Sequence, residues 1–444
     1  MQNFLKKLMK AAVDAGLEAC EAYVVERDSF RAMTSQGEIT EYKSNLTRGL
    51  GFRGMKNGRM GYASTEAFDD EAIDQLVRGV LESAELCEDT DQEFLYQGSD
   101  PVPQLSLQND ELAQTDAEAK IARLQEMDRV IRQNTKVERS ANNTLQSGRY
   151  IIHIVNSYGM DRSYTEDMCL MFGEAVAKEG AFVSSGFYGK AARDMAALDP
   201  KAIGEETARR AVNALNAKPV PSGKYRVVIH GEAMTDLLST FDGIFSAESA
   251  QKDLSLLKGR LGEKIAADCI TLVDDPLLPG GLASRPFDDE GVPSQTTTVI
   301  ENGVFKTFLH NLKTAHKAGV SSTGNASKAS YSAPVHVAPS NFSFRPGSRC
   351  LEDMLASIGD GIVITEVSGL HAGANPLSGD FSLLSKGYAF HNGQRTQAVE
   401  QITVAGNFYD LLKNAREAAN DLVFPMGGTG SPSIDVGELS ISGC

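Results

Sequence analysis

Residues 225–236, YRVVIHGEAMTD, bring a histidine and two carboxylates together where an apolar run passes into a helical pattern. Imidazole nitrogens and carboxylate oxygens are common zinc ligands, and one type of zinc peptidase helix carries two histidines one turn apart with a glutamate as base. At about 100° per residue, however, Glu232 and Asp236 fall opposite an apolar stripe, and His230 points away from Glu232. The stripe consists of Met234, Leu237, Leu238, Phe241, Ile244 and Phe245. The pattern predicts a helix packed on a core, without converging metal ligands.

A second group of carboxylates is consecutive: Asp288, Asp289 and Glu290 lie in the segment FDDEGVP, just before a predicted hairpin. Three carboxylates could bind a hard cation, but the spacing of a calcium loop is missing. Adjacent acidic residues in a loop more often form a solvated turn in which the Asp side chains accept hydrogen bonds from local backbone N–H groups. The sequence favours the solvated turn.

Other motifs carry little chemistry. Residues 49–54, GLGFRG, match G-x-G-x-x-G, but an Asn57-Gly58 hairpin signal follows where a dinucleotide site needs a helix, so a glycine-rich strand is predicted. Residues 255–258, SLLK, have the S-x-x-K spacing without the companion motifs of serine acylases. The seven histidines are scattered, and the six cysteines include no C-x-x-C pair, which argues against a disulfide framework or a thiolate zinc site.

The first half of the chain repeats one order of elements. Helical patterns at 2–16 and about 115–134 each precede alternating, strand-like runs and then a closing helix, after Asp69 and Asp199 respectively. The motifs S-x-G and K-x-G recur 122 residues apart, from 35 to 157 and from 56 to 178. Both a duplication and a merely shared α/β order account for this similarity, because the two copies share little sequence.

Beyond about residue 217 the chain is rich in glycine and strand patterns, with Asn302-Gly303 and Asn392-Gly393 as hairpin signals and helical patterns at 232–246 and 407–420. We therefore predict an α+β fold with two small helix–strand–helix units and a β-rich C-terminal domain. The expected boundaries are 1–87 for the first unit, 88–110 for an acidic, proline-containing linker, 111–216 for the second unit and 217–444 for the C-terminal domain.

The composition argues against binding to nucleic acids and membranes. The 43 basic and 59 acidic residues give a net charge of −16, which repels nucleic-acid backbones and anionic membranes. No apolar run approaches the roughly 20 residues of a membrane span. The N-terminal segment predicts an amphipathic helix and lacks the apolar core of a signal peptide, so we expect a cytoplasmic protein that binds neither nucleic acid nor membrane.

The order of several short motifs resembles the TldD/PmbA family, also called modulators of DNA gyrase or microcin-maturation peptidases. The resemblance spans nearly the whole chain, and each motif is weak alone. The motifs are TSQG at 34–37, GFRG at 51–54, GRMG at 58–61, FDDEGVP at 287–293, IENG at 300–303, GNA at 324–326, NPLSGDF at 375–381, GYAFHNG at 387–393, SPSI at 431–434 and LSISG at 439–443.

The family has two branches, and their difference falls on the opening histidine. TldD proteins carry H-E-x-x-x-H on the helix that opens the C-terminal domain, and a later cysteine completes a zinc site. In this chain Gly231 follows His230, Thr235 stands five after it, and residues 426–431 read MGGTGS where the cysteine motif would fall. The sequence thus resembles the TldE (PmbA) branch, which lacks these ligands and pairs with TldD.

The resemblance implies a partner subunit of a cytoplasmic zinc metallopeptidase complex that acts on small or unfolded peptides, with zinc in a TldD-like paralogous subunit and neither metal nor catalytic residues in this chain. We expect Asp288, Asp289, Glu290, Asn375 and Asp380 to line a peptide chamber or an interface, and a homodimer where the partner is missing. Two alternatives stay open: an autonomous hydrolase using His230, Glu232 or residues 288–290, and a non-enzymatic regulator that binds a protein such as DNA gyrase.

Overall fold

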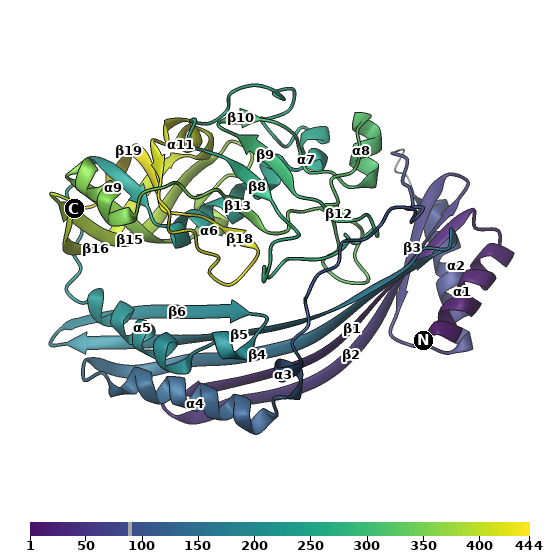
Figure 1. Ribbon diagram of the computed structural model, residues 1–444, viewed down its shortest axis with the longest axis horizontal. Helices are drawn as coiled ribbons and strands as arrows, with labels where there is room; N and C mark the ends of the chain where they lie inside the picture. Colours follow the sequence, from purple (N-terminus) through teal and green to yellow (C-terminus); the bar gives the residue numbers. More distant parts are fainter. Residues whose placement is uncertain (88–90) are drawn as a thin grey trace.

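The computed structural model describes residues 1–87 and 91–444, and the two N-terminal units share one sheet. Six antiparallel strands are hydrogen-bonded in the order β3-β2-β1-β4-β5-β6. They are β1 (Ala19–Ser35), β2 (Glu38–Lys56), β3 (Arg59–Thr65), β4 (Val137–Asn156), β5 (Asp161–Glu179) and β6 (Phe182–Ala192). The antiparallel pairing of the long strands β1 and β4 joins the two units. The first half of the chain therefore forms one curved sheet instead of two separate sheets (Figure 1).

Each unit has the predicted order of a helix, strands and a closing helix, and the strands number three in each unit. The first unit has α1 (Gln2–Asp14) and α2 (Asp70–Leu86), and the second has α4 (Ala117–Gln133) and α5 (Pro200–Asn213). Asp69 and Asp199 cap α2 and α5 as expected, and Asp116 caps α4. A short α3 (Asp110–Gln114) and the 3₁₀ helix Met195–Ala197 complete this half.

The two faces of this sheet have different partners. Even-numbered β1 residues such as Ala22 and Phe30 belong to the cores beneath α1/α2 and α4/α5, so all four helices cover one face. Odd-numbered residues point to the inner face, where Tyr23 packs with Phe287 of the C-terminal half. Figure 1 shows the sheet curving below the C-terminal half, with α4 on its outer side.

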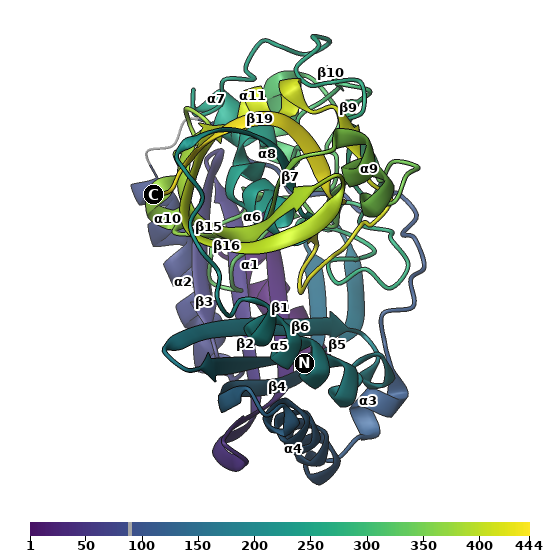
Figure 2. The ribbon, with the colours of Figure 1, turned by 90° about the vertical axis from the view of Figure 1, so that its left-hand side faces the viewer.

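The C-terminal half contains a six-stranded sheet that closes on itself. Its order is β16-β15-β14-β7-β19-β17, with a further β16–β19 pairing. The strands are β7 (Gly223–Ile229), β14 (Gly361–Ser368), β15 (Asp380–His391), β16 (Gln394–Asn407), β17 (Glu417–Ala418) and β19 (Ile434–Ser442). Figure 2 shows β15, β16 and β19 bending around α6 (Gly231–Phe241). All six residues of the predicted apolar stripe are buried, but the helix predicted over 232–246 ends at Phe241, and Ile244 and Phe245 lie in the 3₁₀ helix that follows.

A second, five-stranded sheet has the order β10-β9-β8-β13-β18. Its strands are β8 (Leu272–Asp274), β9 (Thr297–Glu301), β10 (Val304–Phe305), β13 (Phe342–Phe344) and β18 (Thr429–Gly430), and β11 (Ala326–Ser327) pairs with β12 (His336–Val337). The remaining helices are α7 (Ala247–Gln251), α8 (Leu312–Ala318), α9 (Leu351–Ile358), α10 (Leu370–Gly373), α11 (Phe408–Asn414) and the 3₁₀ helix Asp242–Phe245. The fold is therefore α+β with a β-rich C-terminal part, as predicted.

The turns predicted from short sequence motifs are confirmed, whereas a helix predicted from its apolar pattern is shorter than expected. Asn302-Gly303 and Asn392-Gly393 both form hairpin turns with positive φ, and residues 49–54 lie within β2 as expected. The helix predicted over 407–420 is only Phe408–Asn414, because the chain then enters β17. The predicted linker falls partly on residues 88–90, outside the described residues. No helix in the described part of the chain is long and apolar enough to cross a membrane.

Candidate functional site

The start of α6 is where the sequence first suggested metal chemistry. His230 caps the helix, and its Nδ1 accepts a hydrogen bond from the Glu232 N–H at 3.3 Å. Burial lowers the pKa of His230, which favours the neutral ring that this acceptor role requires. Nδ1 is thus already engaged by the helix backbone.

Glu232, the nearest carboxylate in sequence, is held by a cation. Its two oxygens accept hydrogen bonds from Arg210 of α5 at 2.6 and 2.7 Å. Burial alone would raise the pKa of Glu232, but the bonds from Arg210 outweigh it and lower the pKa below its usual value. This bidentate pair connects α6 with the N-terminal half and leaves Glu232 poorly placed as a general base.

Gly231 is enclosed by the segment before β19. A Cβ at Gly231 would lie 2.5 Å from the carbonyl oxygen of Ser431 and 2.9 Å from a methyl group of Val423, so no larger residue fits without a backbone shift. Thr235, one turn later, is 6% exposed, and its hydroxyl has no hydrogen-bond partner within the described structure. Residues 423–431 therefore close the first turn of α6.

These residues do not fit a zinc ion. They offer one imidazole with an engaged nitrogen and a carboxylate already bound to Arg210, whereas a zinc site needs at least three nitrogen, sulfur or oxygen ligands that converge. Across residues 1–87 and 91–444, no group of three His, Cys, Asp or Glu side chains is arranged to hold a metal.

The acidic segment 288–290 is buried, so the predicted solvated turn is wrong. Asp288, Asp289 and Glu290 are 0%, 7% and 3% exposed. One part of the interpretation is correct: Asp288 accepts hydrogen bonds from the N–H groups of Glu290 and Val292, both at 2.9 Å. Burial raises the pKa of Asp288 and of Glu290. The segment is covered because it lies against the inner face of the N-terminal sheet.

Its partners come from both halves of the chain. The Tyr23 hydroxyl of β1 donates to Asp289 at 2.9 Å, and Arg53 of β2 lies 3.4 Å from Glu290 Oε1. Arg53 also binds Glu21, with Nε 2.8 Å from Oε1, and both side chains are almost fully buried. Lys328 lies over the Tyr23 ring, and burial lowers its pKa to about 8. We call these residues (Glu21, Tyr23, Arg53, Asp289, Glu290 and Lys328) the interdomain polar cluster.

Sequence reasoning missed most of this cluster, although one signal was available. Arg53 stands in the apolar run GLGFRGM, where neighbouring side chains are buried, and a buried arginine requires a carboxylate partner. The identity of that partner depends on the tertiary fold, since Glu290 is 237 residues away in sequence.

The structure does not bring residues 375–380 to the interdomain polar cluster. Asn375 accepts hydrogen bonds from the N–H groups of Leu377 and Ser378, forming a turn before β15. Asp380 is bound by Asn407 at 2.9 Å and by Ser378 at 2.8 Å, and these bonds lower its pKa. Both side chains stabilise an exposed loop, and no hydrogen bond or ion pair between described residues connects them with residues 288–290.

The fold and the site together define an α+β protein whose curved N-terminal sheet lies against the C-terminal half. In that half, residues 423–431 pack closely on the first turn of α6. Models of the PmbA/TldA metallopeptidase family match three segments: domain 1 at residues 20–84, the central domain at 110–215 and the C-terminal domain at 222–443. The chain therefore belongs to the PmbA/TldA metallopeptidase family, as the order of its motifs predicted.

Individual relatives agree along the whole chain. A Thermotoga maritima protein, solved as a candidate modulator of a DNA gyrase, is 31% identical with a TM-score of 0.92 over 99% of this chain and all of that one. TldE from Thermococcus kodakarensis is 26% identical, with a TM-score of 0.91 over 99% of this chain and all of that one. Metalloprotease PmbA of Escherichia coli O157:H7 is 27% identical over 94% of this chain and 92% of its own length.

Proposed function

We propose that this chain is a TldE/PmbA-like subunit that pairs with a TldD-type metallopeptidase and helps to enclose small or unfolded peptides for cleavage. The closure of α6 carries the proposal. Gly231 has no room for a side chain, and Arg210 holds Glu232; both features support a subunit that leaves metal binding to its partner. The likeness to a protein named TldE over its whole length supports the same role.

On this proposal the two subunits have different roles. A TldD-like partner would supply the zinc ion, which polarises the scissile carbonyl and activates water. This chain would contribute walls and peptide contacts, and its buried carboxylates at 288–290 would hold its two halves together. Extended peptides commonly bind along strands, which both halves of this chain present.

Co-expression with a TldD-type paralogue from the same genome tests the pairing. We expect the two chains to co-purify and to cleave an unfolded peptide in a chelator-sensitive manner, while this chain alone shows no turnover and forms at most a homodimer. In the complex, His230→Ala of this chain should leave turnover within about twofold, because the ring is not catalytic. Changing the partner's first zinc-ligand histidine should abolish turnover and is the matched control.

Two results would contradict the pairing. Chelator-sensitive turnover or stoichiometric zinc in the purified chain alone would favour an autonomous hydrolase. Recovery of DNA gyrase instead of a metallopeptidase paralogue in a pull-down with mass spectrometry would favour a regulator.

A further inference from the structure

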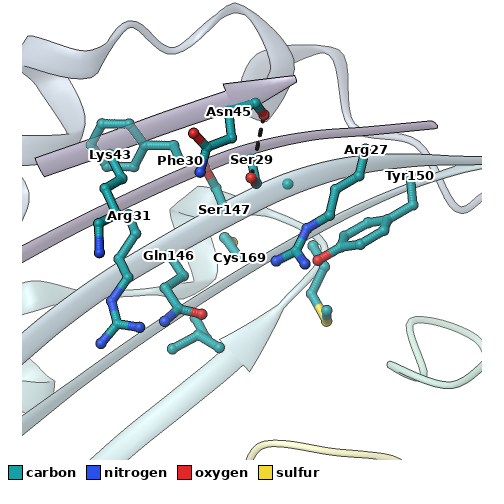
Figure 3. A pocket seen from close by; sticks show the side chains of 13 residues that line it. Arg27, Ser29, Phe30, Arg31, Lys43, Asn45, Gln146, Ser147, Tyr150 and Cys169 are labelled. Atoms are coloured by element: carbon teal, nitrogen blue, oxygen red, sulfur yellow. Dashed lines mark hydrogen bonds between the residues drawn. The ribbon is translucent and has the colours of Figure 1, made fainter. Parts of the chain in front are cut away.

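The middle of the N-terminal sheet carries a basic groove on its inner face. The groove encloses about 210 Å³. We define it by six of the polar residues that line it: Arg27, Ser29 and Arg31 of β1, Lys43 and Asn45 of β2, and Gln146 of β4. Figure 3 shows Arg27, Arg31 and Gln146 pointing to the same side of the sheet, while Phe30 points away from them.

The strand register explains why a hollow forms here. Ser29 is paired with Asn45 on one side and with Gly148 on the other, so a small residue and a residue without a side chain lie next to each other. Two positions away on either side, the larger Arg27 and Arg31 rise from the same face. The sheet surface therefore carries no large side chain between the two arginines. Their positions along β1 are about 13 Å apart, at about 3.3 Å per residue.

The charges of the groove are unbalanced in a protein whose net charge is −16. Arg31 lies directly opposite Lys43 across β1 and β2, an arrangement of like charges that destabilises a sheet. Glu41 partly compensates, at 3.2 Å from Arg31 and 3.4 Å from Lys43. Arg27 stacks on the Tyr150 ring at 5.2 Å, and within the described residues no carboxylate forms an ion pair with it. Two of the three cations, Arg31 and Lys43, thus share one carboxylate, and Arg27 adds a third positive charge.

The groove lies between two contacts of the sheet with the C-terminal half. Towards one end of β1 the Tyr23 hydroxyl binds Asp289. Towards β6, Gly189 lies so close to Met426 that a Cβ there would be 2.8 Å from its sulfur. A ligand must therefore fit beneath the C-terminal half, which suits a thin, extended chain better than a folded protein or a nucleic-acid duplex.

We propose that this groove binds an acidic stretch of an extended peptide through its side-chain carboxylates. In an extended chain, residues i and i+4 point to the same side and are about 13 Å apart, which matches the separation of Arg27 and Arg31. Arginine binds carboxylates in a bidentate manner, and Lys43, Asn45 and Gln146 add donors nearby. The inference rests on the proposed function only in taking a peptide as the ligand, and it adds the class of peptide.

The test measures binding of a fluorescein-labelled peptide, Gly-Glu-Ala-Ser-Ala-Glu-Gly, to the full chain by fluorescence anisotropy. A matched peptide carries Gln in place of both Glu residues. We expect the Glu peptide to bind more than about tenfold more tightly than the Gln peptide, because each charge-assisted pair is lost with Gln. Its affinity should fall as salt concentration rises.

The key variant is the triple substitution Arg27→Gln, Arg31→Gln and Lys43→Gln. Its control changes two arginines and one lysine at exposed positions of other strands, Arg59→Gln, Arg395→Gln and Lys224→Gln, so both variants alter the net charge equally. Arg395 also stacks on a tyrosine, Tyr388, at 4.7 Å, as Arg27 does. We expect the groove variant to lose more than about tenfold in affinity for the Glu peptide and the control to keep it. Equal thermal midpoints would show that both variants fold.

Equal binding of the two peptides, no binding of either, or unchanged binding by the groove variant would overturn the inference. So would a labelled ten-nucleotide single strand that competes with the Glu peptide for the groove. Because this assay uses the chain alone, it is independent of the metallopeptidase partner. Failure here leaves the proposed pairing intact, and failure to recover a partner leaves the peptide groove intact.

Discussion

At the scale of single residues, the first turn of α6 shows how packing restricts chemistry. Gly231 lies against the Ser431 carbonyl, His230 uses a ring nitrogen to cap the helix, and Glu232 is tied to Arg210. Each residue has a structural task in the folded chain. The same three positions could instead be read from the sequence as a degenerate metal site, and only the packing around them decides between these interpretations.

Gly231→Ala tests the closure of this helix start. In an exposed helix, glycine to alanine stabilises by about 1 kcal/mol. Here the new Cβ would lie 2.5 Å from a carbonyl oxygen, so we expect a loss of about 1–3 kcal/mol from overpacking. Gly243→Ala is the control, because a Cβ at Gly243 meets no atom within 4 Å. The thermal unfolding midpoints of both variants are compared with that of the wild type. A higher midpoint for Gly231→Ala than for the wild type would contradict the close packing around Gly231.

The ring of His230 predicts a pH dependence. Burial places its folded-state pKa below the unfolded value of about 6.5, so the folded state prefers the neutral ring. Its contribution is unaffected well above pH 6.5 and is lost as pH falls from that value towards the lower, folded pKa. Acidification from about pH 7.5 to about pH 5.5 therefore lowers the free energy of unfolding.

His230→Asn keeps a capping acceptor and removes the titrating group. We expect the thermal midpoint of this variant to fall less between the two pH values than that of the wild type. The exposed His371→Asn is the matched control and should keep the wild-type slope. Parallel slopes for the wild type and His230→Asn would refute the assignment.

At the scale of elements, local signals and long-range contacts differ in how well the sequence predicts them. Asp69 and Asp199 cap helices, and Asn-Gly pairs form hairpins, because these structures depend on neighbours within a few residues. The pairing of β1 with β4 depends on a register between residues more than 100 positions apart, and no short pattern encodes it. The burial of residues 288–290 follows from that same assembly, which is why the solvated turn was a wrong prediction.

The strand β2 offers a direct test of the contact between the halves. A Cβ at Gly51 would lie 1.8 Å from the carbonyl oxygen of Tyr331, so the segment around residue 331 rests on bare backbone. We expect Gly51→Ala to displace this segment, to cost about 1–3 kcal/mol or more, and to make residues 328–334 more sensitive to protease. Gly223→Ala on β7 is the control, since its Cβ would meet only Tyr225 at 3.6 Å. Equal proteolysis of both variants would exclude this role for Gly51.

At the scale of the whole molecule, the two halves are joined by charges that neither half could bury alone. Arg53 is 2% exposed and lies between Glu21 of its own sheet and Glu290 of the C-terminal half. Removing one member of a buried ion pair leaves a desolvated charge, which costs more than the pair itself contributes. The connection therefore makes the stability of each half depend on the other.

Arg53→Met tests this dependence. It leaves Glu21 and Glu290 buried without their cation, so we expect a loss of about 3–5 kcal/mol. Arg48→Met on the same strand breaks the exposed pair with Glu26 and should cost less than about 1 kcal/mol. The triple variant Glu21→Gln, Arg53→Met and Glu290→Gln removes all three charges and should recover much of the lost stability, because neither glutamate is then left as a buried charge without its cation. The free energy of unfolding of each variant is measured by urea unfolding, monitored by the tyrosine fluorescence of both halves. Equal losses of this free energy for Arg53→Met and Arg48→Met would show that the buried charges do not couple the halves. A triple variant that is less stable than Arg53→Met would show the same.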